Sequence, residues 1–297
     1  MNLTRYINYL TFEKRFSKHT ITAYKGDINS FFSFLKDSYG LTSANEVRSF
    51  HLRSFLAMRL EEGLTAASIN RKKSALQQFF AFLLKCEEIQ SNPAAQLPSL
   101  KHRRSLPDVI PASDMEKLFD QSFLEGVDFW GLRNRVICVL LYATGLRRSE
   151  LISLEVDQIE SEGITIVGKG EKERFIPFSN TLQNWIERYT YQRSKLLNDT
   201  GQQCEFLFFS HSCKALNPKT VYDLVNKELA LFTSVRKKSP HMLRHAFATH
   251  LLDEGAAISS VQKLLGHAGL GATQTYTHVS INRLKNAHAK AHPRNNK

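Results

Sequence analysis

The feature that most constrains the fold is a break in the helical pattern between Gln90 and Asp108. Apolar residues are regularly spaced on either side of this stretch but not within it. It holds three prolines and a run of basic side chains: Pro93, Pro98, Pro107, Lys101, His102, Arg103 and Arg104. Such segments are extended and do not continue a helix, which predicts an interdomain linker. We expect an N-terminal domain over residues 1–98, a basic linker over 99–107 and a C-terminal domain over 108–297.

The N-terminal part is predicted to be all helical. The chain has 297 residues, 42% of them hydrophobic, so each half can bury its own core. Apolar residues recur at three- and four-residue steps from Thr20, the expected cap, to the stop at Gly40. Similar patterns cover 49–61 and, with Ser68 as cap, the stretch before Asn92.

The C-terminal part is predicted to combine helices with a little β-structure. Helices are expected over 112–119, 132–142, 181–195 and 218–232. A further helix is expected to start around Arg148 or Ser149, and a short amphipathic tail is expected over 281–288. Alternating apolar residues around Ile164 and Phe175 flank the turn sequence GKGEKE and predict a β-hairpin. A short strand is expected over 206–209. The fold class is therefore mainly α with a small β-hairpin, in two domains.

The charge balance points to a polyanionic partner. The chain carries 40 Lys and Arg against 28 Asp and Glu, a formal net charge of +12. No apolar run reaches the roughly eighteen residues that a membrane span needs, and the N-terminus lacks a signal-peptide core. We expect a cytoplasmic protein, associated with the nucleoid when it binds DNA, and no membrane partner.

Arginine, histidine and tyrosine side chains gather between residues 240 and 279. Three share one face of a predicted helix, at positions i, i+3 and i+4, and two follow: His241, Arg244, His245, His267 and Tyr276. A guanidinium meets two phosphate oxygens at once and keeps its proton, so this set favours a phosphate site. Tyr276 is the candidate nucleophile, although an isolated tyrosine is more often a packed aromatic.

Other chemistries fit this region less well. His241 and His245 have the spacing of a zinc-binding helix, but Met242 stands where that motif has glutamate, and Arg244 would repel a cation. No metal is therefore expected. No G-x-S-x-G motif suggests a serine nucleophile. The four cysteines form no C-x-x-C pair and are expected to be reduced thiols.

The third N-terminal helix carries polar and basic residues opposite its aromatic stripe. These are Asn70, Arg71, Lys72, Lys73 and Gln77. A solvated basic face is the simpler interpretation. The alternative is a helix laid against DNA, with the cations on phosphates and Asn70 or Gln77 at base edges.

Five segments together resemble the motif set of the tyrosine recombinases, specifically the Xer-type subgroup. They are ATGLRRSEL (143–151), GKGEKERFIP (168–177), HMLRHAFATHLL (241–252), LGHAGL (265–270) and TQTYTHV (273–279), in the family's order. The resemblance extends over essentially the whole chain. It implies an N-terminal SAM-like core-binding domain and a mixed α/β catalytic domain that close around DNA as a C-shaped clamp.

The resemblance also implies the roles of the site residues. Arg147 and Arg244 match the two catalytic arginines, Lys169 the catalytic lysine and Tyr276 the nucleophile. His241 and His267 would complete the phosphate site, supported by Glu150 and His245. Two of these residues have structural alternatives. Arg147 could be a buried structural arginine paired with Glu150, and Lys169 could be merely solvated on a glycine-flanked turn. The implied reaction needs no cofactor: the tyrosine forms a 3′-phosphotyrosyl link to DNA.

Basic side chains near the linker and the hairpin are expected to contact the DNA backbone: Lys101, Arg103, Arg104, Lys172 and Arg174. Two details depart from the usual Xer pattern. Ala246 replaces the serine common after LRH, and AGLGAT replaces the commoner ASLSTT before the tyrosine. Neither removes a group with a proposed chemical role.

The leading hypothesis is a site-specific recombinase acting as a tetramer on two duplexes. By resemblance it resolves chromosome dimers, through a Holliday junction, at a short inverted-repeat (dif-like) site. The tetramer would contain one kind of subunit or would include a paralogous recombinase. A DNA translocase is a candidate activator. The alternatives are a mobile-element integrase, a nick-and-reseal enzyme similar to type IB topoisomerases, and a DNA-binding protein with an idle site.

Overall fold

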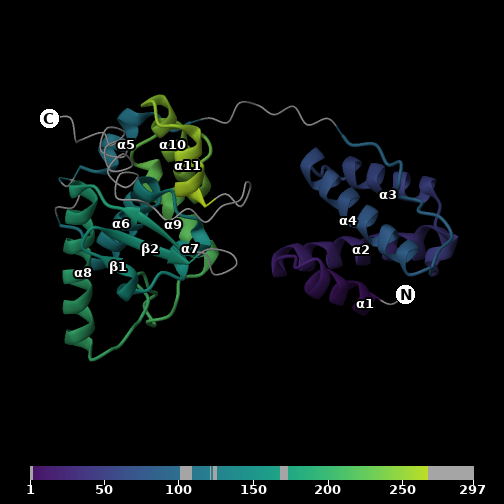
Figure 1. The fold of residues 1–297 in the computed structure, drawn as a ribbon, viewed down its shortest axis with the longest axis horizontal. Helices are drawn as coiled ribbons and strands as arrows, with labels where there is room; N and C mark the ends of the chain where they lie inside the picture. The colour runs from purple at the N-terminus through teal and green to yellow at the C-terminus, as the bar shows by residue number, and fades with distance from the viewer. Residues whose placement is uncertain (1–2, 101–108, 121, 123–125, 168–172, 267–297) are drawn as a thin grey trace. The chain divides into compact units, whose positions relative to one another are not determined.

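The computed structural model describes residues 3–100, 109–120, 122, 126–167 and 173–266, which form parts of two compact units, Met1–Leu106 and Pro107–Lys297 (Figure 1). The division falls within the proline-containing stretch. The finer limits at 98 and 107 stay a prediction. The predicted fold class is confirmed, because helices dominate both units and the sheet is small and antiparallel. Among these residues, no helix is long and apolar enough to cross a membrane.

The N-terminal unit is helical throughout its described length. Its elements are α1 Leu3–Asn8, the π-helical turn η1 Tyr9–Glu13, α2 Lys18–Tyr39, the 3₁₀ turn η2 Ala44–Glu46, α3 Ser49–Glu61 and α4 Ala66–Lys85. The aromatic stripes of α2, α3 and α4 meet in the core, where Phe31, Phe55, Phe79 and Phe80 are fully buried. Each such side chain contributes about 1.5–3 kcal/mol through burial.

Both helix caps predicted in this unit, Thr20 and Ser68, were wrong, because each observed cap lies three residues earlier. The caps are Ser17 and Thr65, whose hydroxyl oxygens accept the backbone N–H groups of Thr20 and Ser68. The predicted residues are therefore the third helical positions. Where two hydroxyl residues stand three apart, the first can cap the amide of the second, so the helix starts earlier.

The second unit is built around α6 Phe129–Thr144. Eight successive residues of this helix, 136–143, are buried, which is typical of a helix surrounded by others. Around it lie α5 Ala112–Leu118, α7 Arg148–Ile152, α8 Asn180–Thr200, α9 Pro218–Ala230 and α10 Pro240–Asp253, with α11 Ile258–Leu265 packed on α10. The expected helices are confirmed, and the expected tail over 281–288 lies outside the described residues.

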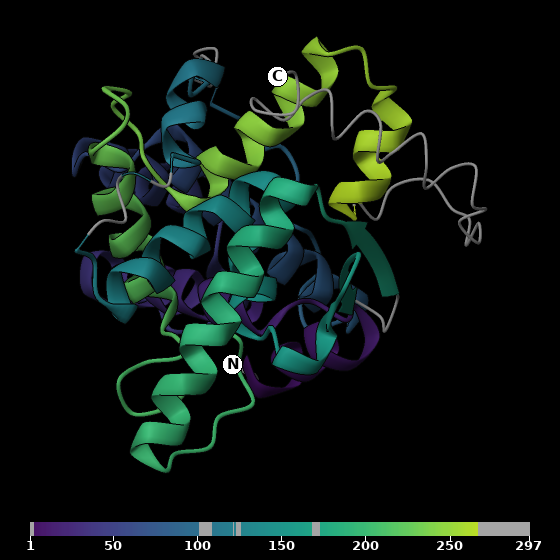
Figure 2. The same cartoon turned by 90° about the vertical axis from the view of Figure 1, so that its left-hand side faces the viewer.

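The predicted hairpin is confirmed as β2 Gly163–Val167 and β3 Glu173–Pro177, paired antiparallel with Ile166 opposite Arg174. A two-residue edge strand, β1 Ile159–Glu160, adds a third strand that the sequence did not reveal. After a quarter turn of the molecule, α11 ends beside these strands (Figure 2).

The strand predicted over 206–209 is wrong. This segment makes only isolated bridges, at Phe206 and Phe209, although Leu207 and Phe208 are fully buried. Arginine side chains take its carbonyl groups in place of a neighbouring strand: Arg193 bonds the carbonyls of Phe206 and Leu207, and Arg133 bonds that of Phe209. An apolar run shows that a segment is buried, but not which groups satisfy its backbone.

Candidate active site

Arg147 lies at the N-cap of α7, directly after the turn that ends α6. Its backbone N–H and its Nη1 each donate to the Glu150 carboxylate at 2.8 Å. Its Nη2 donates to the carbonyl of Gly266 at 2.8 Å. The side chain remains 40% exposed, so part of its guanidinium still faces outward. Arg147 is therefore held in place without being buried.

Arg244 lies on α10 and is buried. Its Nη1 donates to the Gly145 carbonyl and its Nη2 to the Leu265 carbonyl, both at 2.6 Å. Burial, reinforced by the nearby charge of Arg147, lowers the pKa of Arg244 to about 10. The guanidinium thus stays charged at neutral pH, and because two like charges lie close together, the site favours an anion.

Glycine at position 145 makes this arrangement possible. Gly145 has a positive φ of 62°, and a Cβ there would lie 2.5 Å from the Phe247 ring and 2.9 Å from Leu265. The close packing of α10 and the end of α11 against this turn allows the Gly145 carbonyl to accept from Arg244. A larger residue would push apart the elements that carry the two arginines.

Arg174 on β3 is the third guanidinium of the cluster. Its Nε donates to the Leu264 carbonyl at 3.0 Å, and its Nη1 and Nη2 donate to the two oxygens of Glu150 at 3.1 and 2.7 Å. The side chain is only 8% exposed. The predicted phosphate contact of Arg174 therefore needs correction, because the structure places this side chain inside the protein, where each of its nitrogens has a partner.

Glu150 is the carboxylate that holds the arginines together. Burial acts to raise its pKa, but the hydrogen bonds from Arg174 and Arg147 outweigh burial, and the pKa lies below the usual range. Its single negative charge faces three guanidinium groups, since Arg244 is also nearby. A positive surplus remains on the cluster, which is what a phosphate site requires.

The histidines of α10 differ in exposure. His241, in the first turn, is exposed, whereas His245 is half-buried and Arg244 between them is buried. The predicted spacing is confirmed, since all three lie on one helix. Within the part of the chain that the structure describes, no three His, Cys, Asp or Glu side chains gather as a metal site would need.

Several predicted site residues lie outside the described residues. These are Lys169, Lys172, His267 and Tyr276, together with Lys101, Arg103 and Arg104. Their roles stay predictions. The structure brings together Arg147, Glu150 and Arg244, and it adds Arg174 to them.

The polar face of α4 is used inside the N-terminal unit, which corrects the base-reading hypothesis. The Asn70 side chain exchanges two hydrogen bonds with the backbone of Leu100, at 2.9 and 3.0 Å. Gln77 donates to the carbonyl of Ala94 at 3.1 Å, and Lys73 donates to the Ser99 hydroxyl at 2.7 Å. These side chains fasten residues 94–100 to the helix.

Arg71 and Lys72 also have intramolecular partners. Both donate to Asp27 on α2, Lys72 at 2.8 Å and Arg71 through both Nη atoms. Lys72 is nearly buried, whereas the Arg71 side chain is 44% exposed. The sequence signal for this ion pair is Asp27, a charged residue within the apolar pattern of α2.

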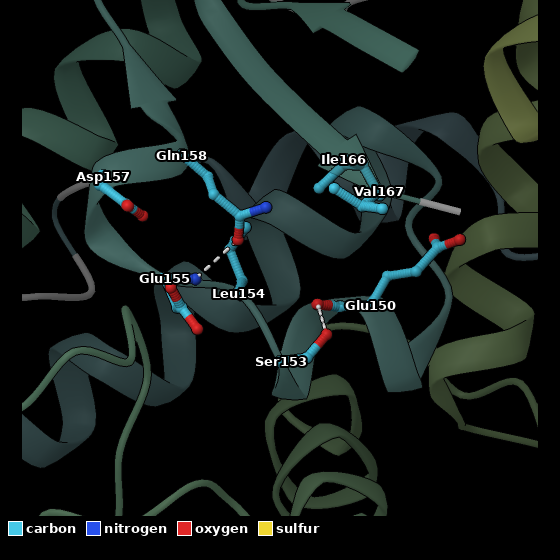
Figure 3. A pocket seen from close by; sticks show the side chains of 8 residues that line it. All are labelled: Glu150, Ser153, Leu154, Glu155, Asp157, Gln158, Ile166 and Val167. Atoms are coloured by element: carbon cyan, nitrogen blue, oxygen red, sulfur yellow. Dashed lines mark hydrogen bonds between the residues drawn. The ribbon is translucent and has the colours of Figure 1, made fainter. Parts of the chain in front are cut away.

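A separate pocket of about 380 Å³ lies on another side of Glu150 (Figure 3). Its lining includes Glu155 and Asp157, and Gln158 accepts the backbone N–H of Glu155 at 2.9 Å. Figure 3 shows Glu150 and Asp157 on opposite sides of the pocket. Glu155 and Asp157 in its wall disfavour a phosphate, so the arginine cluster is the better candidate for an anion site.

Known proteins resemble this chain over nearly its whole length. The sequence pattern of the phage integrase family matches residues 109–283, and that of the phage integrase N-terminal SAM-like domain matches residues 3–87. Tyrosine recombinase XerD of Listeria monocytogenes serotype 4b is 36% identical over 292 residues, covering 97% of each chain. Tyrosine recombinase XerC of Bacillus licheniformis is 37% identical over 298 residues, covering 99% of this chain and 97% of the relative.

Solved structures show the same fold. A lambda integrase dimer bound to a COC′ core site superposes with a TM-score of 0.68 at 18% identity, covering 92% of this chain and 97% of that one. The Tn1549 transposon integrase in complex with transposon right end DNA gives 0.69 at 19% identity, covering 95% and 97%. The chain belongs to the phage integrase family, the tyrosine recombinases. Within that family it is a Xer-type enzyme, a site-specific DNA recombinase.

Proposed function

We propose that this recombinase cuts and rejoins double-stranded DNA through a covalent link between Tyr276 and a DNA phosphate. The observation that carries the proposal is the pair Arg147 and Arg244, which backbone carbonyls and Glu150 hold in place. Groups already in position need no reorganisation during the reaction, which makes electrostatic stabilisation of a transition state effective. The exposed part of Arg147 is where the phosphate enters.

In the proposed reaction the phenolic oxygen of Tyr276 attacks the phosphorus atom, and the bond from phosphorus to the 5′-oxygen breaks. Lys169 protonates that leaving oxygen, while Arg147 and Arg244 bind the non-bridging oxygens. His241 and His267 complete the phosphate site, and one of them accepts the phenolic proton as Tyr276 attacks. The product is a 3′-phosphotyrosyl ester and a free 5′-hydroxyl.

The ester conserves the energy of the broken bond, so rejoining needs no nucleotide. The 5′-hydroxyl of a partner strand attacks the ester, Tyr276 leaves, and the strands have been exchanged. When one strand of each of two duplexes has been exchanged in this way, the product is a Holliday junction. Six basic side chains are proposed to contact backbone phosphates and not bases: Lys101, Arg103, Arg104, Lys172, the exposed Arg71 and the half-buried Lys73.

The working assembly is proposed to be a tetramer on two copies of an inverted-repeat site. A lambda integrase has been solved as a tetramer bound to a Holliday junction, and it shares this fold. The relatives named XerC and XerD are the basis for proposing a role in chromosome dimer resolution, with one kind of subunit or with a paralogous partner. A DNA translocase is a candidate activator.

The test begins with the Tyr276→Phe variant, which should bind DNA without cutting it. Mapping the DNA that this variant retains on the chromosome gives the site. A duplex of that site, nicked next to the expected cut so that rejoining fails, is then incubated with the wild-type protein. A protein–DNA adduct that survives denaturation, and that Tyr276→Phe does not form, is the expected result.

Two results would contradict the proposal in different ways. A wild-type protein that binds the site but never forms the adduct is a DNA-binding protein with an idle site. Adduct formation by complexes that sediment as single subunits would favour a topoisomerase-like enzyme over a recombinase tetramer.

A further inference from the structure

The last turn of α11 accepts hydrogen bonds from three different arginines. The carbonyls of Leu264, Leu265 and Gly266 bind Arg174, Arg244 and Arg147, respectively. These carbonyls lie at the end of a helix, where they have no intrahelical partner. The positive charges also face the negative end of the helix dipole. Three consecutive carbonyls thus have one guanidinium each.

The three arginines come from three distant parts of the chain. Arg147 precedes α7, Arg174 lies on β3 and Arg244 lies on α10. The end of α11 is therefore where these elements meet. Gly266 ends the helix with a φ of 62°, and a Cβ there would come within 3.1 Å of the Arg174 guanidinium. The next residue in the chain is His267, and Tyr276 follows nine positions later.

Arg174 differs from the other two arginines. Arg147 is partly exposed, and Arg244 donates its hydrogen bonds to the carbonyls of Gly145 and Leu265. Arg174 bonds both oxygens of Glu150 and a carbonyl of α11, and it is nearly buried. Arg174 therefore links Glu150, which orients Arg147, to the end of α11, after which the sequence continues to Tyr276.

We propose that Arg174 is a positioning residue for strand cleavage. By bonding Glu150 and the Leu264 carbonyl together, it fixes Arg147 and the end of α11 in one arrangement, from which the chain continues to the nucleophile. This role rests on the proposed function of Arg147 and Tyr276. Arg174 touches neither DNA nor the reacting atoms in this role.

The decisive variant is Arg174→Lys. Lysine keeps the positive charge but has a single donor nitrogen, so it cannot span two carboxylate oxygens and a carbonyl as the planar guanidinium does. A displacement of about 1 Å at a reacting centre costs on the order of 10²-fold in rate. We expect Arg174→Lys to slow adduct formation on the nicked duplex by about 10²-fold at saturating DNA. The affinity for the site and its dependence on salt should stay as in the wild type.

Arg193→Lys is the matched control. Arg193 is also buried, lies in the same unit and bonds three carbonyls, those of Cys204, Phe206 and Leu207. It takes no part in the arginine cluster. Its variant should lower the melting temperature as Arg174→Lys does, but it should leave the rate of adduct formation unchanged.

A second measurement changes Glu150, the ion-pair partner of Arg174. Glu150→Gln retains the shape of the side chain and an oxygen to accept the Arg147 amide, but it removes the charge. If Arg174 acts through Glu150, the double variant Glu150→Gln/Arg174→Lys should be no slower than the slower single variant. Rates that multiply would mean that the two residues act independently, and they would overturn the proposal.

The remaining outcomes separate the possible roles. Arg174→Lys with the wild-type rate would show that a point charge suffices, as for a phosphate contact, or that the residue only stabilises the fold. Either result overturns the positioning role while the wild-type adduct upholds the proposed function. A wild-type protein that forms no adduct overturns the proposed function itself.

Discussion

Each unit contains one nearly buried carboxylate that accepts hydrogen bonds from two cationic side chains. In the N-terminal unit Asp27 binds Arg71 and Lys72. In the C-terminal unit Glu150 binds Arg147 and Arg174. The two clusters have the same local chemistry. They differ in what else their cations bind.

In the N-terminal cluster the ion pairs join α2 to α4, since Arg71 and Lys72 both bind Asp27. In the C-terminal cluster both arginines also bind carbonyls at the end of α11, where Arg244 joins them. The first cluster fastens two helices. The second fixes the guanidinium groups of Arg147 and Arg174 at the end of α11 and leaves the Arg147 side chain partly exposed, so under the proposed function it prepares a site as well as a fold.

The largest effect is expected at Arg244, which donates its hydrogen bonds to backbone carbonyls and not to Asp27 or Glu150. Arg244→Ala removes a buried charge that two backbone carbonyls hold in place and that is proposed to bind the phosphate. Losing one oriented donor of this kind costs about 10²–10³-fold in rate. Adduct formation on the nicked site should fall by about that factor or more. A rate within about threefold of the wild type would remove Arg244 from the reaction.

Asp27→Asn tests whether the N-terminal cluster serves the fold alone. The variant leaves Lys72 nearly buried without its counter-charge, a change that costs about 3 kcal/mol in the free energy of unfolding. Denaturant unfolding followed by circular dichroism measures that loss. The rate of adduct formation at saturating DNA should be unchanged. A slower rate would mean that this cluster also prepares the reaction, and the contrast between the units would fail.

Asn70→Ala tests the attachment of residues 94–100 to α4. It removes two hydrogen bonds to Leu100, which together contribute about 1–2 kcal/mol. Amide hydrogen exchange at Leu100 should become faster, while exchange in α6 stays the same. Asn45→Ala, at an exposed asparagine of the same unit, is the control and should change neither. Unaltered exchange at Leu100 would show that the segment is held by its apolar contacts instead.

The smallest effect is a pH dependence that the two units share. Burial lowers the pKa of His51 in the first unit and of His250 in the second. The Nδ1 atom of His51 accepts the backbone N–H of Arg48, and the Nδ1 atom of His250 shares a hydrogen bond with the Tyr142 hydroxyl. Below about pH 6.5 the unfolded chain takes up the proton first, so stability falls as the pH drops toward the folded pKa.

His51→Asn and His250→Gln each remove one titrating group while they retain a polar side chain. Each should flatten the decline in melting temperature between about pH 7 and about pH 5 for its own unit. Calorimetric scans across this range provide the measurement. A decline as steep as in the wild type would assign the pH dependence to other groups.

Much of this architecture follows from local patterns. The helix α3 begins and ends where its apolar spacing predicted, at Ser49 and Glu61, and the β2–β3 hairpin follows its alternation. The helix starts at Ser17 and Thr65 were missed because two hydroxyl residues compete for one cap. The choice between them depends on backbone geometry, and the residue types do not reveal it.

The candidate site was only partly predictable. Arg147, Glu150 and Arg244 were found from their motifs, and the structure brings them together. Arg174 was assigned to DNA because an arginine after a hairpin turn is usually exposed. Its burial depends on β3 lying against the end of α11, ninety residues away in the chain. Asn70 and Gln77 were misassigned for a similar reason, since their partners lie on a segment without regular structure.

The sequence by itself determined the division into two units, the helical faces that form each core and the motifs that mark Arg147, Glu150 and Arg244 as site residues. These depend on residue type and on spacing within one or two turns. Only the tertiary structure decided which atoms those arginines bind, because the carbonyls of residues 264–266 gain their partners when α10, β3 and the turn at Gly145 pack together. A hydrogen bond requires an approach within about 3 Å, and packing between distant segments sets that distance.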